Sequence, residues 1–438
     1  MFRSPSSGRF EFATAAPADS VPVHDPPLSP HDEAVFLLNL AAEIEHSLMV
    51  QYLFATYSLR PAGQFPPDKA ALVRGWKRTI ARVAREEMGH LVTVQNLLRS
   101  LGASLSLARD EFPLNTGFYP FDFTLEPLTK NSTAKYAFAE MPPENLVTGI
   151  DGVTPAEIAD IIRRANTDNA RNPVNRVGKL YDQLMTIIES LPASEFSAPS
   201  VSHQAKFDEW GLDEDDLLIL PISNRDDAIA ALQRIAEQGE GPITAGAAAD
   251  PNSHFQQFLG IYRHIPEAGD WEPAFPIIAN PNVRTDTNPG QITQPEARLW
   301  AQLLNVRYRR LLITLRHALE IEAASPAGTA TTSRGLLISW TFSEMYNIRS
   351  ISEILVSLPA TSSAGENRTA GAPFEMPSSL SLPTAEADRW RLQASILQSA
   401  DVVVNSLIAL PSTHADFLNG MITSDSEAIH IASHVGGN

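Results

Sequence analysis

Residues 73–101, with the sequence VRGWKRTIARVAREEMGHLVTVQNLLRSL, decide the fold class of this chain. Steps of three and four residues from Val73 follow a row of apolar side chains that only Glu87 and His90 interrupt. Positions with this spacing share one face of an α-helix, so both polar residues point the same way as the apolar ones. An ionised carboxylate in a protein interior is strongly destabilising unless a partner compensates its charge. The stretch therefore predicts a buried helix that presents Glu87 and His90 to a partner inside the protein.

A second helical run precedes this one, from His31 to about Leu59. One of its faces has a carboxylate, Glu45, in the middle of an otherwise apolar or aromatic stripe, whose other members are Ala34, Leu38, Ala41, Leu48 and Tyr52. Arg60-Pro61 ends the run, and a short Pro-rich loop leads into the helix predicted at residues 68–101, which Gly102 closes. Helices joined by such a loop pack as antiparallel neighbours. We therefore predict an αα-hairpin with Glu45 opposite the Glu-x-x-His pair.

A Glu on one helix facing Glu-x-x-His on the next is half of the metal site of ferritin-like bundles, in which two more helices supply the other half. Carboxylates neutralise the metal charge, and imidazole adds a neutral nitrogen ligand that suits iron, zinc, copper or nickel. The alternative is structural, because the same carboxylates could pair with Lys77, Arg82 or Arg85, which lie near the right turns. The metal interpretation is favoured because each predicted helix places its ligand-type residues at the centre of an apolar stripe.

The composition limits the partners and the chemistry. The chain has 438 residues, of which 43% are hydrophobic and 19% are charged, as in ordinary globular proteins. Its formal net charge is -18 at pH 7, so we expect no binding to nucleic acid or to an anionic membrane. The chain has no cysteine, so a metal must take its ligands from His, Asp and Glu. We expect a transition metal, with iron as the first choice and manganese or zinc as alternatives.

The N-terminal residues 1–30 are rich in Pro, Ser and Ala and contain no apolar core of the length that a signal peptide needs. Nowhere do about 18 or more apolar residues run together, as a membrane-spanning helix requires. These features predict an extended N-terminal arm at residues 1–30 and a cytoplasmic location.

The rest of the chain is predicted to be mainly α-helical. Residues 103–173 are dense in Pro, Asn, Thr and aromatic residues, so we interpret them as a long insertion with one short helix near its end. Further helices are predicted at residues 174–191, 226–238, 294–324, 334–358 and 385–410. No alternating βαβ pattern occurs, so a parallel sheet is not expected. We predict a metal-binding bundle over residues 31–264 and a C-terminal helical region over residues 265–438 that packs on it.

Two further residues are candidates for the second half of the metal site. The apolar series of the helix at 226–238 points toward position 239 or 240, which makes Glu240 the preferred ligand and Glu237 the reserve. Glycines flank Glu240 on both sides and are unfavourable in a helix interior, so the helix is expected to distort or end there. His254 lies on an apolar face of a short helical segment, where a histidine is more often a core residue than a ligand.

Six short segments resemble the ferritin-like family of the iminophenyl-pyruvate dimer synthases, which includes the violacein and rebeccamycin assembly proteins. They are EIEHSLMVQYL at 43–53, EEMGH at 86–90, VGKLY at 177–181, IAEQGEG at 235–241, SHFQQF at 253–258 and AGAPFE at 370–375. The most specific combination is Gln-Gly-Glu-Gly followed by His-Phe, after a helix with Glu-Glu-x-x-His. The resemblance implies a ferritin-like bundle in which Glu45, Glu87, His90, Glu240 and His254 bind the metal.

The chain departs from this family at two places. Val50-Gln51 stands where two prolines are usual, and Lys179 where an acidic residue is common. These changes concern the first helix and the surface of the third, so they bear on the substrate more than on the metal. Tyr52, Trp76 and Tyr181 could line a substrate pocket, but their interpretation as core aromatics is favoured.

The resemblance implies a metal-dependent oxidoreductase or synthase that acts on a small amino-acid-derived metabolite, either an imine or an aromatic compound. The first alternative is a non-catalytic metal-binding or metal-storage bundle, which a closed site without a substrate-sized cavity would favour. The second is a structural protein that kept the fold and lost the chemistry. We expect a small-molecule substrate as the partner, and the sequence leaves open whether copies of the chain form a homo-oligomer.

Two other patterns receive structural interpretations. Glu344 lies in an apolar stripe and is expected to pair with a buried arginine such as Arg349 rather than to bind metal. Glu427 and His430 have the Glu-x-x-His spacing, but they lie in a polar stretch close to the C-terminal Gly-Gly-Asn and are interpreted as part of a tail.

Overall fold

A computed structural model of the chain describes residues 24, 26–114, 122–147, 150, 152–165, 176–196, 202–210, 217–241, 250–284, 290–322, 332–363, 367–410 and 414–436. Within these residues the protein is built from helices, and β-structure is limited to isolated bridges such as the one between Leu59 and Ala274. The mainly α-helical fold class predicted from the sequence is therefore confirmed. The part of the chain that is described contains no helix long and apolar enough to cross a membrane.

Two long antiparallel helices form the base of the first bundle. Helix α1 (Pro30–Ser58) begins after Ser29, whose hydroxyl accepts a hydrogen bond from the Asp32 amide at 3.1 Å, and proline occupies its first position. Helix α2 (Pro67–Ser100) ends before Gly102, which has a φ of 74° that glycine adopts without strain. The two helices pack along their length, as the predicted αα-hairpin requires.

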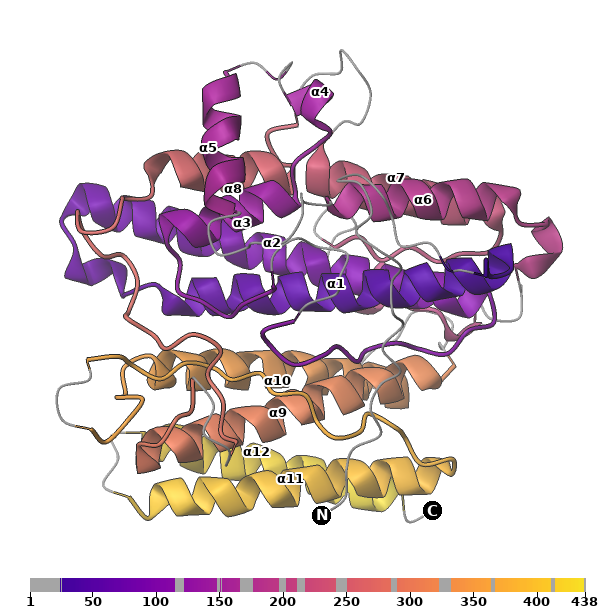
Figure 1. Ribbon diagram of the computed structural model, residues 1–438. Helices are drawn as coiled ribbons and strands as arrows, with labels where there is room; N and C mark the ends of the chain where they lie inside the picture. Colours follow the sequence, from indigo (N-terminus) through magenta and orange to yellow (C-terminus); the bar gives the residue numbers. More distant parts are fainter. Residues whose placement is uncertain are drawn as a thin grey trace.

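The other side of the first bundle consists of shorter helices (Figure 1). Helix α3 (Lys130–Ala139) packs on α8 (His254–His264) toward one end of the hairpin, and α6 (Val177–Ser190) packs on α7 (Arg225–Glu240) toward the other. Smaller elements are α4 (Glu144–Val147), α5 (Pro155–Ala165) and the 3-10 turns η1 (Ala62–Gln64), η2 (Ala193–Glu195) and η4 (Phe207–Trp210). The two pairs of short helices therefore meet near the middle of α1 and α2.

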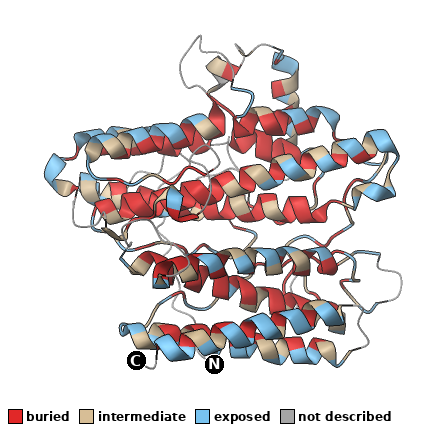
Figure 2. Cartoon of the chain, turned by 180° about the vertical axis from the view of Figure 1, so that it is seen from behind, coloured by how far each residue is buried: buried red, intermediate tan, exposed pale blue. Residues whose placement is uncertain are grey.

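A second bundle lies against the first and is drawn in orange and yellow in Figure 1. It contains α9 (Pro295–Glu320), α10 (Ser333–Leu355), α11 (Glu386–Ile408) and α12 (Ala415–Val435). Helix α9 packs on α10 and α11, α11 packs on α12, and α10 contacts α1 of the first bundle. Figure 2 shows that the buried residues line the inner faces of both bundles, whereas the exposed residues cover the outside.

Buried ion pairs connect three helices of the second bundle. Arg307 of α9 contacts Asp425 of α12 at 2.8 Å and Glu344 of α10 at 3.3 Å, and Arg310 also pairs with Glu344. The structural interpretation of Glu344 holds, but Arg349 is the wrong partner. Positions five apart lie on different faces of a helix, and Arg349 forms an exposed pair with Glu353 instead.

The main errors in the predicted elements are two missing helices. Helix α3 lies inside the insertion at 103–173, and α12 includes Glu427 and His430, which are exposed on a regular helix rather than in a tail. The predicted arm at residues 1–30 falls mostly outside the described residues, as does the expected start of the third helix at Val174. The proposed division at residues 264 and 265 stays a prediction, although α8 ends at His264.

Candidate metal centre

The candidate centre lies where the short helices of the first bundle end, beside the middle of α1 and α2. Glu140 is the residue that caps the C-terminus of α3, α7 ends at Glu240, and α8 begins at His254. Gly241 follows Glu240 with a φ of 92°, so the helix ends at the glycine as the sequence predicted. The helix ends therefore bring side chains from distant parts of the chain to the two central helices.

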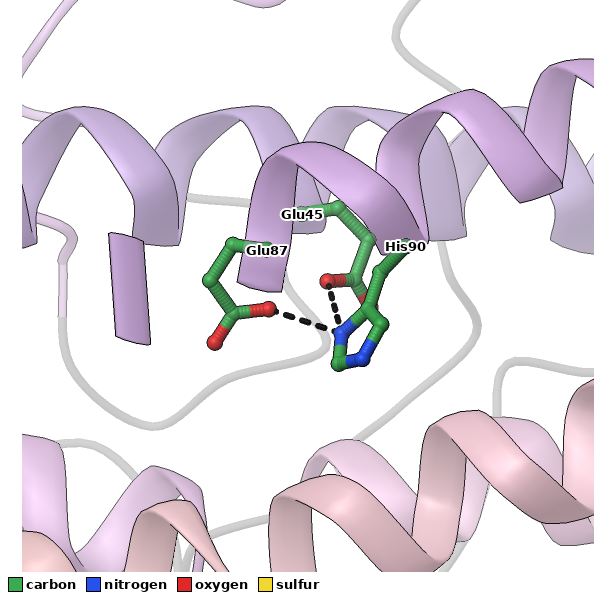
Figure 3. Close-up of side chains that lie close together, drawn as sticks. All are labelled: Glu45, Glu87 and His90. Atoms are coloured by element: carbon green, nitrogen blue, oxygen red, sulfur yellow. Dashed lines mark hydrogen bonds and ion pairs between the residues drawn. The ribbon is translucent and has the colours of Figure 1, made fainter. Parts of the chain in front are cut away.

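The first cluster consists of Glu45, Glu87 and His90 (Figure 3). The Nδ1 atom of His90 lies 3.0 Å from Oε2 of Glu87 and 3.3 Å from Oε2 of Glu45. All three residues are at most 2% exposed. Tyr181 of α6 donates a hydrogen bond to the other oxygen of Glu45, Oε1. The Glu45 carboxylate is thereby oriented with one oxygen toward the histidine.

The second cluster consists of Glu87, Glu140 and His254. The Nδ1 atom of His254 lies 3.0 Å from Oε1 of Glu87 and 3.6 Å from Oε2 of Glu140. Tyr52 of α1 donates a hydrogen bond of 2.5 Å to the other oxygen of Glu140. Glu87 belongs to both clusters, and its two oxygens face the two histidines. The arrangement thus has two adjacent ligand sets that share one carboxylate.

The outer nitrogens of both histidines are also hydrogen-bonded. Nε2 of His90 lies 2.7 Å from Oε1 of Gln238, and Nε2 of His254 lies 3.1 Å from Oε2 of Glu86. Both partner atoms are acceptors, so each Nε2 carries the hydrogen. In a neutral imidazole this leaves the lone pair on Nδ1, which faces the carboxylates. The tautomer that a metal needs is therefore fixed from outside the clusters.

Burial and mutual charge shift the pKa values of these groups. Burial, reinforced by the charge of Glu87, raises the pKa of Glu45 to about 7. Burial opposes protonation of His90, but hydrogen bonds with Glu45 and Glu87 prevail and raise its pKa to about 10. His254 follows the same pattern, because the charge of Glu87 and its carboxylate hydrogen bonds overcome burial and raise its pKa. Without a cation, the protein holds protons at its histidines to balance the carboxylates.

The donor set fits metal ions. Oε2 of Glu45 faces Nδ1 of His90 at 3.3 Å, and Oε1 of Glu87 faces Nδ1 of His254 at 3.0 Å, all of them buried. Carboxylate oxygens and imidazole nitrogens that face one another in a protein interior are costly unless a proton or a cation lies between them. Four carboxylates surround the two histidines once Glu86 and Glu140 are included, and their charge would balance that of two divalent cations. The ion pairs of Glu45 and Glu87 within the described residues are with histidines, so the arginine bridges that would favour the structural alternative are not found there.

The comparison with known protein families agrees with this arrangement of two carboxylate-histidine clusters inside a helical bundle. The model of the family described as ferritin-like matches residues 38–263. The chain belongs to the ferritin-like family. The match includes every residue of both clusters and more than half of the chain.

Two proteins similar to this chain are named as a synthase and a dimerase. The chain is 26% identical over 400 residues to dichlorochromopyrrolate synthase from Lentzea aerocolonigenes, covering 81% of this chain and 38% of that protein. It is 26% identical over 373 residues to 2-imino-3-(indol-3-yl)propanoate dimerase from Chromobacterium violaceum, covering 78% of this chain and 33% of that protein. The chain thus spans about a third of the length of these relatives. The resemblance predicted from the six short segments is confirmed.

A solved structure of a ferritin-like protein from Caulobacter vibrioides also matches, with a TM-score of 0.41 and 19% sequence identity. The match covers 76% of this chain and 98% of that protein.

Four of the five predicted ligands come together in this ferritin-like bundle, namely Glu45, Glu87, His90 and His254. Glu240 is buried but lies outside both clusters, and its Oε1 atom accepts a hydrogen bond of 3.0 Å from the Gly178 amide. A Cβ atom at Gly178 would lie 2.1 Å from that oxygen, so a larger residue there would displace the Glu240 carboxylate. The role of these five residues as ligands stays a prediction.

Sequence reasoning missed Glu140 and Glu86. Glu140 follows a short helix that was hidden in an insertion rich in Pro and Thr, although Thr129 and Ser132 form a capping box at its start. Glu86 was visible beside Glu87 but lies off the apolar stripe, and its contact with α8 depends on tertiary packing. Both residues are recognisable only when the helix ends are placed in space.

A cavity of about 310 Å³ adjoins the centre. Its walls include Glu86 and Gln238, the two acceptors behind the histidines, and the reserve ligand Glu237. The other lining residues are Arg82, Leu218, Arg234, Asp250 and Asn252. Its volume is at the lower end of the range for small-molecule pockets, so the first bundle offers a polar space beside a buried ligand cluster.

Proposed function

We propose that this chain binds transition-metal ions at two adjacent positions that share Glu87, and uses them as an oxidoreductase or synthase for a small amino-acid-derived metabolite. The observation that supports the proposal is the pair of buried clusters, in which carboxylate oxygens and imidazole nitrogens face one another. Iron is the proposed metal, with manganese or zinc as alternatives, because carboxylate and imidazole ligands suit these ions.

The residues around the clusters would prepare them for chemistry. A bound transition metal supplies redox chemistry with dioxygen or peroxide, or Lewis-acid polarisation of an imine or carbonyl group. Tyr181 and Tyr52 hold Glu45 and Glu140 by hydrogen bonds to one oxygen each, which leaves the second oxygen directed inward. Burial of the clusters keeps bulk water away from the carboxylates and strengthens their interaction with a cation.

The proposed substrate class is based on the names of the two relatives. One relative is named as a dimerase of an indole-bearing 2-imino acid and the other as a chromopyrrolate synthase. We therefore propose an aromatic 2-imino acid, or a compound derived from one, as the first class to test. Arg82 and Arg234 in the adjoining cavity would offer positive charge to its carboxylate.

Elemental analysis of the purified protein tests the metal proposal. We expect about one or two equivalents of a transition metal, which a Glu87→Ala/His90→Ala double variant of equal helicity should lose. Glu43→Gln is the matched control, since Glu43 lies on the same part of α1 as Glu45 but accepts a hydrogen bond from the Asp110 amide at 2.8 Å. Absence of metal in the wild-type protein, even after reconstitution with iron, manganese and zinc, would exclude the proposed function.

The alternative function is metal binding or storage without catalysis. The cavity beside the centre favours the enzyme, because a storage protein needs no polar space of this size next to its ligands. Supplying excess ferrous iron in the presence of dioxygen separates the two functions. An enzyme should remain at about two ions per chain or fewer, whereas a storage protein should continue to accumulate iron. Product formation from an aromatic 2-imino acid, followed by mass spectrometry, would then identify the chemistry.

A further inference from the structure

The two histidines of the centre have different groups behind their outer ring nitrogens. His254 donates to a carboxylate, Glu86, at 3.1 Å, whereas His90 donates to the neutral side-chain amide oxygen of Gln238 at 2.7 Å. Both imidazoles are at most 2% exposed. Two residues of the same type, in the same tautomer and equally buried, therefore differ by one formal charge in their nearest hydrogen-bond partner.

The remaining parts of the two ligand sets are matched. Each set contains its own carboxylate, Glu45 or Glu140, and both share Glu87. Each of the two unshared carboxylates accepts one tyrosine hydroxyl. The number of nearby carboxylates and the hydrogen bonds to them therefore do not distinguish the two positions, and the difference lies in Glu86 and Gln238.

An acceptor behind a metal-binding imidazole increases the electron density at the opposite nitrogen, and a charged acceptor does so more than a neutral one. Glu86 is itself only 6% exposed, so water screens its charge weakly. Arg82 lies 3.8 Å from Glu86, but its side chain is 40% exposed, so its compensating charge is better screened. His254 should thus be the more basic ligand of the two.

We infer that the two metal positions are inequivalent, that the position beside His254 fills first and binds a divalent ion more tightly, and that Glu86 and Gln238 set this order. The inference rests on the proposed metal centre and goes beyond it. Glu86 and Gln238 act through the histidines and are positioning residues. Glu86 and Gln238 line the same cavity and belong to neither ligand cluster. Each can therefore be substituted without replacing a residue of the two clusters.

Anaerobic calorimetric titration of the metal-free protein with Fe²⁺, repeated with Co²⁺ and its visible absorption, tests the inference. The wild-type protein should bind in two steps of different affinity. His254→Ala should lose the tighter step, and His90→Ala the weaker one. These two variants assign each step to one histidine.

The roles of Glu86 and Gln238 are tested by replacing the carboxylate with an amide and the amide with a carboxylate. Glu86→Gln should weaken the tighter step about 10-fold to 100-fold, and Gln238→Glu should strengthen the weaker step, so that in each variant the two affinities converge. Arg82→Gln is the matched control, because it changes a charge in the same cavity without touching a histidine, and it should leave the tighter step as tight or tighter. If Glu86→Gln does not fold, Gln238→Glu still decides the question.

The outcomes separate this inference from the proposed function. Two equal steps in the wild-type protein, or two steps that neither exchange moves, would overturn the inequivalence while leaving the metal centre intact. Loss of both steps in a folded Glu86→Gln protein would make Glu86 a ligand and would also overturn it. Absence of any binding to the wild-type protein would reject the proposed centre, and the inference with it.

Discussion

The imidazole rings of His90 and His254 stack at an interplanar angle of 28°, with their centroids 5.5 Å apart, although one lies within α2 and the other begins α8. Both rings direct Nδ1 toward Glu87, which lies between the two ligand sets. Metal ions in two-metal sites are typically about 3.5–4 Å apart, a separation that one carboxylate can bridge. The arrangement is compatible with the proposal that each histidine serves its own metal position beside Glu87.

The two tyrosines give the first prediction. Tyr181→Phe and Tyr52→Phe each remove the donor that holds one carboxylate, Glu45 or Glu140, in place. Because groups around metal ligands commonly change metal affinity about 10-fold to 100-fold, we expect each variant to weaken one of the two binding steps by about 10-fold. Calorimetric titration with Fe²⁺ measures this effect. Tyr57→Phe, at another buried tyrosine of α1, is the control, and an equal loss in all three variants would show that the effect is not specific.

Glu240→Gln distinguishes a ligand from a structural residue. Burial raises the pKa of Glu240 to about 8, so its carboxyl group holds a proton at neutral pH while one oxygen accepts the Gly178 amide. Glutamine can make the same hydrogen bond, and we therefore expect this variant to keep its metal and its stability. Elemental analysis measures the metal content, with Glu140→Gln in parallel as the variant that should lose one equivalent. Loss of metal from Glu240→Gln would instead support the ligand role predicted from the sequence.

The sequence alone was sufficient to predict the burial of those site residues that lie on continuous helices. Glu45, Glu87 and His90 occupy uninterrupted stripes of α1 and α2, and helical periodicity alone places them on buried faces. His254 was favoured as a ligand only through the family resemblance, because a single histidine on an apolar face does not distinguish a ligand from a core residue. The two glycines that flank Glu240 predicted that the helix would distort or end near this residue, and α7 ends there.

The parts that could not be predicted depend on where helices stop. The ferritin-like pattern leads one to expect a second Glu-x-x-His pair on one helix. In this chain the corresponding groups are Glu140 and His254, which are 114 positions apart and lie at the ends of two different helices. Spacing within a sequence cannot reveal such a pair, because the contact is created by the packing of α3 on α8.

The buried charges of the second bundle predict a large loss of stability when one partner is removed. Asp425→Ala leaves Arg307 buried with less compensation, and breaking such pairs typically costs about 3–5 kcal/mol in the free energy of unfolding. We expect the second bundle to be destabilised by that order in urea unfolding followed by circular dichroism. Glu353→Ala, which removes the exposed partner of Arg349, should cost less than about 1 kcal/mol. Similar losses in both variants would contradict the structural role of the buried pairs.

The pH dependence of stability should differ between the metal-free and the metal-bound protein. In the metal-free protein the pKa of Glu45 rises from 4.5 to about 7 and that of His90 from 6.5 to about 10. Between each pair of values the folded protein holds a proton that the unfolded chain has released, so the free energy of unfolding falls as the pH rises. The stabilisation from His90 is fully present below pH 6.5 and is lost as the pH rises through about 10.

Metal binding displaces these protons, so the stabilisation that a bound ion adds should grow with pH. Urea unfolding of metal-free and metal-loaded protein between about pH 5 and pH 9 measures both trends over the range in which the two groups titrate. We expect the metal-free protein to lose stability over this range by at least about 1 kcal/mol, and the difference between the two forms to widen. Glu45→Gln should flatten the metal-free curve between pH 4.5 and about 7. A metal-free protein that became more stable with rising pH, or a Glu45→Gln variant with an unchanged curve, would show that these two groups do not govern the stability of the centre.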